Sequence, residues 1–174
     1  SDTYAAAGAK LIFHNIREAY HNPDNMEAKN NMLLGAFYGG VAITGSGTTA
    51  VHALSYPLGG KYHIAHGVSN AILFAHVMEF NMKACEERLA QLCDIVYPQK
   101  VEESTNDKAR YIIGQIAGIV KDTGIPTDLS EFGVKRADLD VLVDAGSKQQ
   151  RLLVNNRKSL SLEDIRNIYL KVLK

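Results

Sequence analysis

This sequence contains no tryptophan and has no excess of either charge, since 19 lysines and arginines balance 19 aspartates and glutamates. Proteins that bind nucleic acids or anionic membranes usually carry a net basic field, which this chain lacks. Aromatic residues form 7% of the chain and do not alternate with basic residues, so base stacking is not indicated. The composition therefore argues against nucleic acid and membrane as partners.

Long hydrophobic runs are also missing. Every apolar stretch is interrupted by glycine, histidine or a charged residue well before the roughly 18 residues that suggest a membrane-spanning helix. No pattern typical of a signal peptide precedes the first predicted helix. The chain opens with Ser1-Asp2-Thr3 rather than methionine, which indicates a truncated or processed product. We expect a cytoplasmic protein.

Only two cysteines are present, Cys85 and Cys93, and both fall in a predicted helix. Eight residues of helix separate their Cα atoms by about 12 Å, which is too far for a disulfide. Their spacing also differs from the Cys-x-x-Cys pattern of zinc and redox pairs. We therefore predict ordinary thiols in a reducing compartment.

Strict alternation of apolar and polar residues, the mark of a strand, is absent, and helical periodicity runs through almost the whole chain. Near the C-terminus Ser161 and Asp164 have the spacing of a capping box, with Asp in place of Glu. We predict an all-α, multi-helix bundle that forms a single domain over residues 1–174. The expected helices are residues 4–20, 26–45, 67–81, 82–97, 106–123, 135–145, 148–153 and the segment after Ser161.

Small residues are concentrated in the predicted helix 26–45 and predict close packing by another helix: Ala36, Gly39, Gly40 and Ala42. The glycine-rich stretch at residues 45–49 lacks the Gly-Lys-Ser/Thr ending of a phosphate-binding loop, and no strand precedes it. A nucleotide site there is not indicated.

Four of the six histidines gather in residues 52–77, namely His52, His63, His66 and His76. Neutral imidazole is the commonest metal ligand near neutral pH. Pro57 is expected to end the helix that carries His52, and Gly59, Gly60 and Gly67 permit backbone turns that aim two side chains at one point. Spacing alone favours structural histidines over ligands. We expect His14 and His21 to be surface or hydrogen-bonded core residues, and His76 to form a hydrogen bond in the core. The nearest downstream carboxylate, Glu79, lies thirteen residues beyond His66.

The stretch AVHALSYPLGGKYHIAHGVSNAILFAHVMEFN, Ala50 to Asn81, closely resembles the signature region of iron-containing (group III) alcohol dehydrogenases. The resemblance extends through NMLLGAFYGGVA before it, GIPTDLSEFGV after it and the NNR…SLEDIRNIY ending, so it covers nearly the whole chain. It implies a two-domain subunit of the dehydroquinate synthase-like fold. In such a subunit an N-terminal α/β domain would bind NAD or NADP, and this chain would correspond to the C-terminal helical metal-binding domain alone.

The resemblance implies four metal ligands: an Asp, a His four residues later, and two further His that correspond to His52 and His66. The first two would precede Ser1. The implied metal is Fe²⁺, with Zn²⁺ as the alternative. Tyr56 stands where many members have a histidine, which implies a position near the nicotinamide and the substrate. A phenol with a pKa of about 10 is a poorer proton shuttle than histidine at neutral pH.

Residues near the implied ligands can also be compared with the family. Asn70 and His63 are candidates to support the ligands or to line the pocket. Ala65 and Ala75 replace prolines that are common in the family, which loosens the backbone and removes no ligand.

For the intact parent, the resemblance implies an oxidoreductase that interconverts an alcohol and an aldehyde or ketone by hydride transfer. Its partners would be a small-molecule substrate and its own N-terminal domain, and a homo-oligomer stays open. The isolated chain is predicted to be inactive. Two alternatives remain. One is a relative of glycerol dehydrogenase or dehydroquinate synthase, which use zinc, and the other is a non-enzymatic helical interaction domain with structural histidines.

Overall fold

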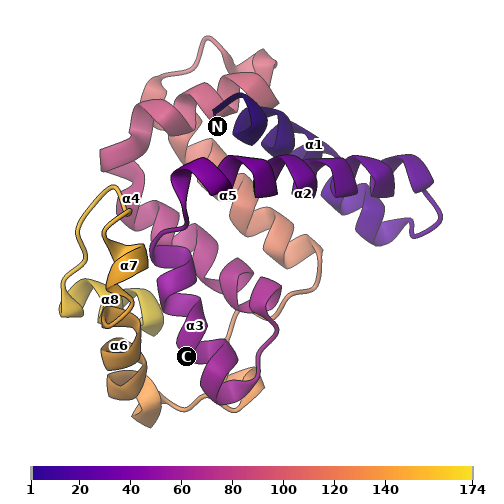
Figure 1. Cartoon of the computed structure of the whole chain (residues 1–174). Coiled ribbons are helices and arrows are strands. Elements are labelled where there is room, and N and C mark those ends of the chain that lie inside the picture. The colour runs from indigo at the N-terminus through magenta and orange to yellow at the C-terminus, as the bar shows by residue number, and fades with distance from the viewer. Residues whose placement is uncertain (1, 174) are drawn as a thin grey trace. The chain divides into compact units, whose positions relative to one another are not determined.

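The computed structural model describes residues 2–173, and this range contains helices and no strand, which confirms the predicted all-α class (Figure 1). None of its helices is both long and apolar enough to cross a bilayer. The longer helices are α1 (Asp2–His21), α2 (Met26–Ser46), α3 (Ala50–Tyr62), α4 (His66–Val96), α5 (Thr105–Asp122), α6 (Leu139–Ser147) and α8 (Leu162–Leu170). The short helical elements are η1 (Pro98–Lys100), η2 (Leu129–Phe132), η3 (Arg136–Asp138) and α7 (Gln150–Leu153).

The chain divides into two compact units. The first unit comprises the residues up to Gly47 together with Cys85–Gln115, and the second comprises Thr48–Ala84 together with the residues from Ile116 onward. Helices α4 and α5 each contribute to both units, so the chain passes between the units three times.

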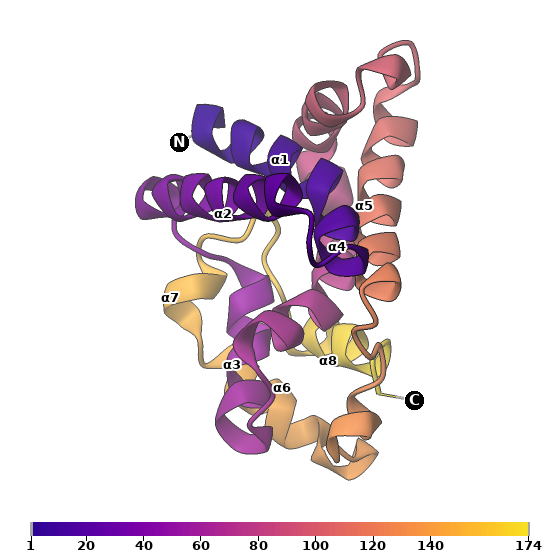
Figure 2. The ribbon, with the colours of Figure 1, turned by 90° about the vertical axis from the view of Figure 1, so that its right-hand side faces the viewer.

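The first unit contains the α1–α2 hairpin, whose two helices lie side by side (Figures 1 and 2). They approach closely at two glycines, because a Cβ on Gly8 would lie 2.9 Å from the carbonyl oxygen of Gly35. Asn25 caps α2 by accepting a hydrogen bond from the Ala28 amide. The sequence therefore predicted the close helix contact and its residue Ala42 correctly. It missed Gly35, and Gly39 and Gly40 do not make the contact, since a Cβ on either would meet nothing within 4 Å.

The second unit is built around a core of fully buried side chains from α3, α6 and α8, including Leu54, Leu142 and Ile165. These helices pack against one another, and α7 also packs on α3 (Figure 2). Gly146 allows α6 to approach, because a Cβ there would lie 2.9 Å from the Leu54 side chain. Helix α3 is thus held on several sides by its own unit.

Two helix boundaries differ from the sequence prediction. Pro57 lies inside α3, which continues to Tyr62, because Leu54 and Leu58 on either side of it are fully buried and hold the helix in the core. The two helices expected at residues 67–81 and 82–97 form one element, α4, whose break lies at Cys85 (φ −136°, ψ 21°). Asn81 does not end a helix because its buried amide exchanges hydrogen bonds with Asn156 at 2.9 and 2.7 Å.

Other local predictions are confirmed. Ser161 and Asp164 form the predicted capping box at the start of α8. Neither Cys85 nor Cys93 forms a disulfide. The short helices near residue 140 are displaced by a few residues from their predicted ranges, as expected for elements of one or two turns.

Candidate metal centre

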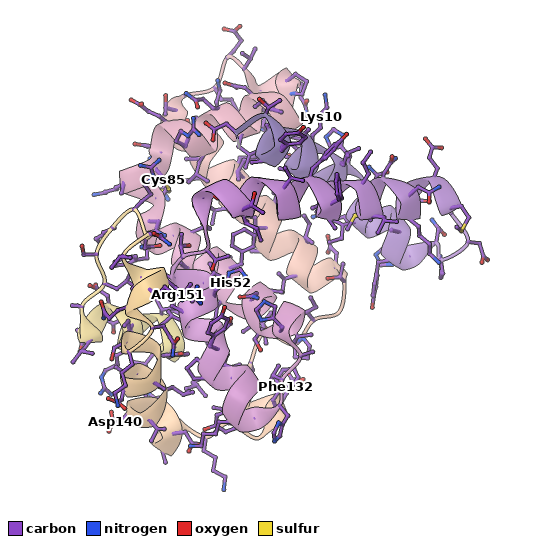
Figure 3. All side chains as sticks on the ribbon, in the orientation of Figure 1. Lys10, His52, Cys85, Phe132, Asp140 and Arg151 are labelled. Atoms are coloured by element: carbon purple, nitrogen blue, oxygen red, sulfur yellow. The ribbon has the colours of Figure 1, made fainter. Side chains whose placement is uncertain are left out.

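The two predicted metal ligands come from neighbouring elements of the second unit. His52 lies in the first turn of α3, and His66 is the first residue of α4 (Figure 3 labels His52). Between them α3 ends at His63, whose left-handed backbone (φ 55°) reverses the chain. This reversal brings two imidazoles fourteen residues apart to a ring-centre separation of 5.2 Å, with their planes at 56°.

This separation fits two imidazoles on one metal ion. Metal–nitrogen bonds of about 2.0–2.1 Å at a tetrahedral angle place the centres of two coordinated rings roughly 5 Å apart. Among residues 2–173, however, no group of three or more His, Cys, Asp and Glu side chains could hold a metal ion. The described residues therefore bring two candidate ligands together and no third.

The electrostatics of His52 favour the ligating form of its ring. Burial, and after it the nearby His66, lowers the pKa of His52 below its ordinary value. Since an imidazole binds a metal through its lone pair, a lowered pKa keeps the neutral ring available at physiological pH.

Tyr56 lies one helical turn after His52 on α3 and joins the same cluster. Its ring centre is 6.4 Å from that of His52 and 6.1 Å from that of His66. The residue is 39% exposed, so its hydroxyl group can reach a molecule bound beside the two imidazoles. Tyr56 offers such a molecule a hydrogen bond, whereas a phenol is a weak base at neutral pH.

Asn70 lies one turn after His66 on α4 and contacts it directly. The Asn70 side-chain nitrogen is 3.0 Å from Nε2 of His66. The other end of the amide, Oδ1, is buried and has no hydrogen-bond partner. The backbone beneath is anchored by Ser69, whose hydroxyl donates to the carbonyl oxygens of Ile64 and Ala65.

The remaining histidines of the cluster have other roles. His63 is the left-handed C-cap of α3 and belongs to the turn. His76 is partly buried, and its Nδ1 lies 3.8 Å from a carboxylate oxygen of Glu79, which is longer than a hydrogen bond. Burial lowers the pKa of His76, and the Glu79 carboxylate opposes this in part. Glu79 in turn forms an ion pair with Lys171 at 2.7 Å. The expected core hydrogen bond of His76 is therefore not formed at Nδ1, which is buried without a hydrogen-bond partner.

Sequence reasoning missed Tyr169, which supports the helix of the site. Tyr169 is fully buried on α8, and its hydroxyl donates a 2.7 Å hydrogen bond to the carbonyl oxygen of Leu54, between His52 and Tyr56 on α3. Burial raises its pKa, so the hydroxyl keeps its proton. Its position in the apolar register of the last helix was visible in the sequence, but its acceptor was not, because residue 54 lies 115 positions away.

Comparisons with known proteins agree with this architecture. The profile of the Fe-containing alcohol dehydrogenase family, C-terminal, matches residues 1–173. Long-chain-alcohol dehydrogenase 1 of Geobacillus thermodenitrificans (strain NG80-2) is 35% identical over 169 residues, which are 97% of this chain and 43% of that protein. The 1,3-propanediol dehydrogenase of Citrobacter freundii is 34% identical over 158 residues, covering 91% of this chain and 41% of that one.

The structures agree as well. The crystal structure of a 1,3-propanediol oxidoreductase matches 99% of this chain with a TM-score of 0.93 at 29% identity, and the match covers 45% of that chain. This chain therefore spans less than half the length of the relatives it matches.

Proposed function

This chain belongs to the Fe-containing alcohol dehydrogenase family, in its C-terminal part, and on that premise we propose that it is the metal-binding domain of an NAD(P)-linked alcohol dehydrogenase. The intact enzyme would interconvert an alcohol and an aldehyde or ketone by hydride transfer. The substrates named for its relatives, long-chain alcohols and 1,3-propanediol, support a primary alcohol as the substrate class.

One observation carries the proposal. The rings of His52 and His66, which the resemblance pairs as ligands, are 5.2 Å apart although they come from different helices. Two imidazoles with lone pairs at this separation suit a divalent metal such as Fe²⁺ or Zn²⁺. A bound divalent ion supplies Lewis acidity to the oxygen of the alcohol.

The chain's own residues have separate tasks in this proposal. His52 and His66 hold the metal from one side, and the lowered pKa of His52 keeps its ring unprotonated. Tyr56 donates a hydrogen bond from its hydroxyl group toward the substrate or the nicotinamide, and positions it without removing a proton. The Tyr169 hydroxyl fixes the backbone of α3 between these residues.

The missing parts of the site belong to the rest of the parent chain. We assign the N-terminal region, which this sequence lacks, to a nicotinamide-binding α/β domain, and the two further ligands to an Asp-x-x-x-His pair shortly before Ser1. The short coverage of the relatives supports this division, since more than half of each lies outside the match.

The proposal is tested by metal content in the full-length parent. Replacing His52 or His66 with alanine should weaken metal binding by more than tenfold, because loss of even an outer partner of a ligand costs about 10–100-fold. Metal content after gel filtration, measured by mass spectrometry, also identifies iron or zinc. His21→Ala makes the same chemical change on an exposed residue and should leave metal content unchanged. Full metal retention by His66→Ala would refute the ligand assignment.

The isolated chain gives a second test. It has two imidazoles and no nicotinamide-binding domain, so we expect no NADH-dependent aldehyde reduction by residues 1–174 alone. Addition of Fe²⁺ or Zn²⁺ should not restore activity. Steady turnover by the purified chain would contradict the proposed division of labour between the two domains.

A further inference from the structure

The contact between Asn70 and His66 bears on how the metal enters the site. A neutral imidazole has one N–H and one nitrogen with a lone pair, and only the lone pair binds a metal. The Asn70 amide nitrogen, 3.0 Å from Nε2 of His66, has no lone pair to offer, so its N–H donates a hydrogen bond to Nε2. The proton of the ring then resides on Nδ1. In this arrangement neither nitrogen of His66 is open to a metal.

The other end of the amide indicates that this hydrogen bond is readily given up. Oδ1 of Asn70 is buried and accepts no hydrogen bond, and a buried acceptor without a partner is unfavourable. If the Asn70 amide were turned by 180°, its NH₂ group would take the buried position of Oδ1, and its two N–H donors would be buried there. The present orientation therefore stabilises the ring and leaves the carbonyl oxygen without a donor.

The backbone does not need to move for this release. Residues His66 and Asn70 are four apart in the first turns of α4, where neighbouring side chains meet on one face. The Ser69 amide bonds to the Ala65 carbonyl oxygen at 2.9 Å, and the Ser69 hydroxyl reinforces this turn. Asn70 can therefore turn about its own side-chain bonds while the imidazole stays in place.

We propose that Asn70 is a positioning residue that holds the Nε2 lone pair of His66 while no metal is bound and releases it when the metal arrives. The inference rests on the proposed function, since it takes His66 as a ligand. In the metal-free protein Asn70 selects the ring form with the proton on Nδ1, which is the form that binds metal through Nε2. It also competes with the metal for that nitrogen.

The test compares metal affinity in the full-length parent stripped of metal by a chelator, with Co²⁺ as the probe and its visible absorption as the signal. Asn70→Ala and the bulkier Asn70→Leu both remove the donor, so both should bind Co²⁺ about two- to tenfold more tightly, the range expected for one lost hydrogen bond. Asn167→Ala makes the same change on an exposed residue of α8 and should bind like the wild type.

A second readout is independent of affinity. Nitrogen-15 chemical shifts of selectively labelled histidine report which ring nitrogen carries the proton. The metal-free wild type should show His66 with its proton on Nδ1, and Asn70→Leu should lose this preference. Circular dichroism spectra establish that each variant is folded.

Three outcomes would overturn the inference. Weaker Co²⁺ binding by Asn70→Ala would make Asn70 an ordinary support of the ligand, and unchanged binding would remove any role in metal entry. A proton on Nε2 in the wild type would reverse the proposed hydrogen bond. His66→Ala separates the two proposals. If it loses Co²⁺ while the Asn70 variants bind like the wild type, only this inference fails, and if it binds Co²⁺ normally, the ligand assignment itself fails.

Discussion

Helices α2 and α3 follow one another in the chain and are both rich in small and apolar residues, yet they use these residues differently. Helix α2 exposes large apolar side chains, with Leu33 73% and Phe37 63% exposed. Its buried residues form one narrow seam with a spacing of seven: Ala28, Gly35 and Ala42. Helix α2 is thus packed along a single line.

Helix α3 is enclosed on most of its circumference. Leu54 and Leu58 are fully buried, and Tyr56 is its only large apolar side chain among the exposed ones. The candidate ligand His52 and its neighbour Tyr56 lie on this helix. The candidate ligand therefore lies on the helix that is packed on most sides, which suits this role because a metal ligand needs a backbone that is held in place.

The largest expected difference between α2 and α3 is in the free energy of unfolding that is lost when a leucine is replaced by alanine. Leu54→Ala should lower the free energy of unfolding by about 2–5 kcal/mol, because it opens a cavity in the buried core. Leu33→Ala on α2 should change it by less than about 0.5 kcal/mol, since Leu33 is mostly exposed. Urea unfolding followed by circular dichroism measures both. Equal losses would show that the exposed face of α2 is covered in solution.

Two glycine-to-alanine substitutions within α2 are expected to change the free energy of unfolding by smaller amounts and in opposite directions. A Cβ on Gly35 would lie 2.9 Å from the Ile12 side chain and 3.1 Å from the Gly8 carbonyl oxygen, so Gly35→Ala should destabilise the protein by about 1–3 kcal/mol. Gly40→Ala meets nothing within 4 Å and should stabilise it by about 0.5–1 kcal/mol. The melting temperatures of the two variants should move in opposite directions. A Gly40→Ala variant that is less stable would mean that another surface packs against this glycine.

The smallest predicted difference concerns helix caps. Hydrogen bonds from the Ser161 hydroxyl and backbone N–H lower the pKa of Asp164, which caps α8 in the second unit. A carboxyl with a lowered folded-state pKa contributes stability above its unfolded pKa of about 3.9 and loses it as the pH falls through the folded value. Unfolding free energies at pH values between neutral and strongly acidic should show this loss, of no more than about 0.5 kcal/mol, because solvent screens a carboxylate that is hardly buried.

The matched variants are Asp164→Asn, which should remove that part of the acid dependence, and Asn25→Ala at the start of α2. Asn25 caps α2 through a neutral amide, so its removal should cost about 1 kcal/mol at every pH. An Asp164→Asn variant with unchanged acid sensitivity would show that the capping carboxylate does not contribute.

Much of the fold could be predicted because its signals are local. The periodicity of α1, α2 and α5 and the Ser161–Asp164 cap depend on residues a few positions apart. The sequence predicted the break in α4 after Asn81, whereas it lies at Cys85. The Asn81 side chain instead pairs with Asn156, 75 residues away, and no local signal reveals this partner. Pro57 was misjudged for a similar reason, since long-range burial of its neighbours outweighs its local preference.

The candidate site also has features that the sequence predicts and features that depend on the folded chain. The resemblance assigned His52 and His66, but their spacing of fourteen residues did not fix a distance. That distance depends on the left-handed turn at His63, a conformation that non-glycine residues adopt rarely. The Asn70 contact follows from helical spacing once α4 is known to begin at His66, whereas the Tyr169 contact depends on the packing of the whole second unit.

Because the chain passes between its two units three times, neither unit can be completed early in synthesis. Neither unit is a continuous stretch of sequence, since Thr48–Ala84 interrupts the first and Cys85–Gln115 interrupts the second. A ribosome that works from the N-terminus releases the α1–α2 hairpin well before the segments of α4 and α5 that complete its unit. The side of α1 that contacts Val96 through His14 and Tyr97 through Phe13 therefore stays without these partners in the nascent chain until residue 97 has been made.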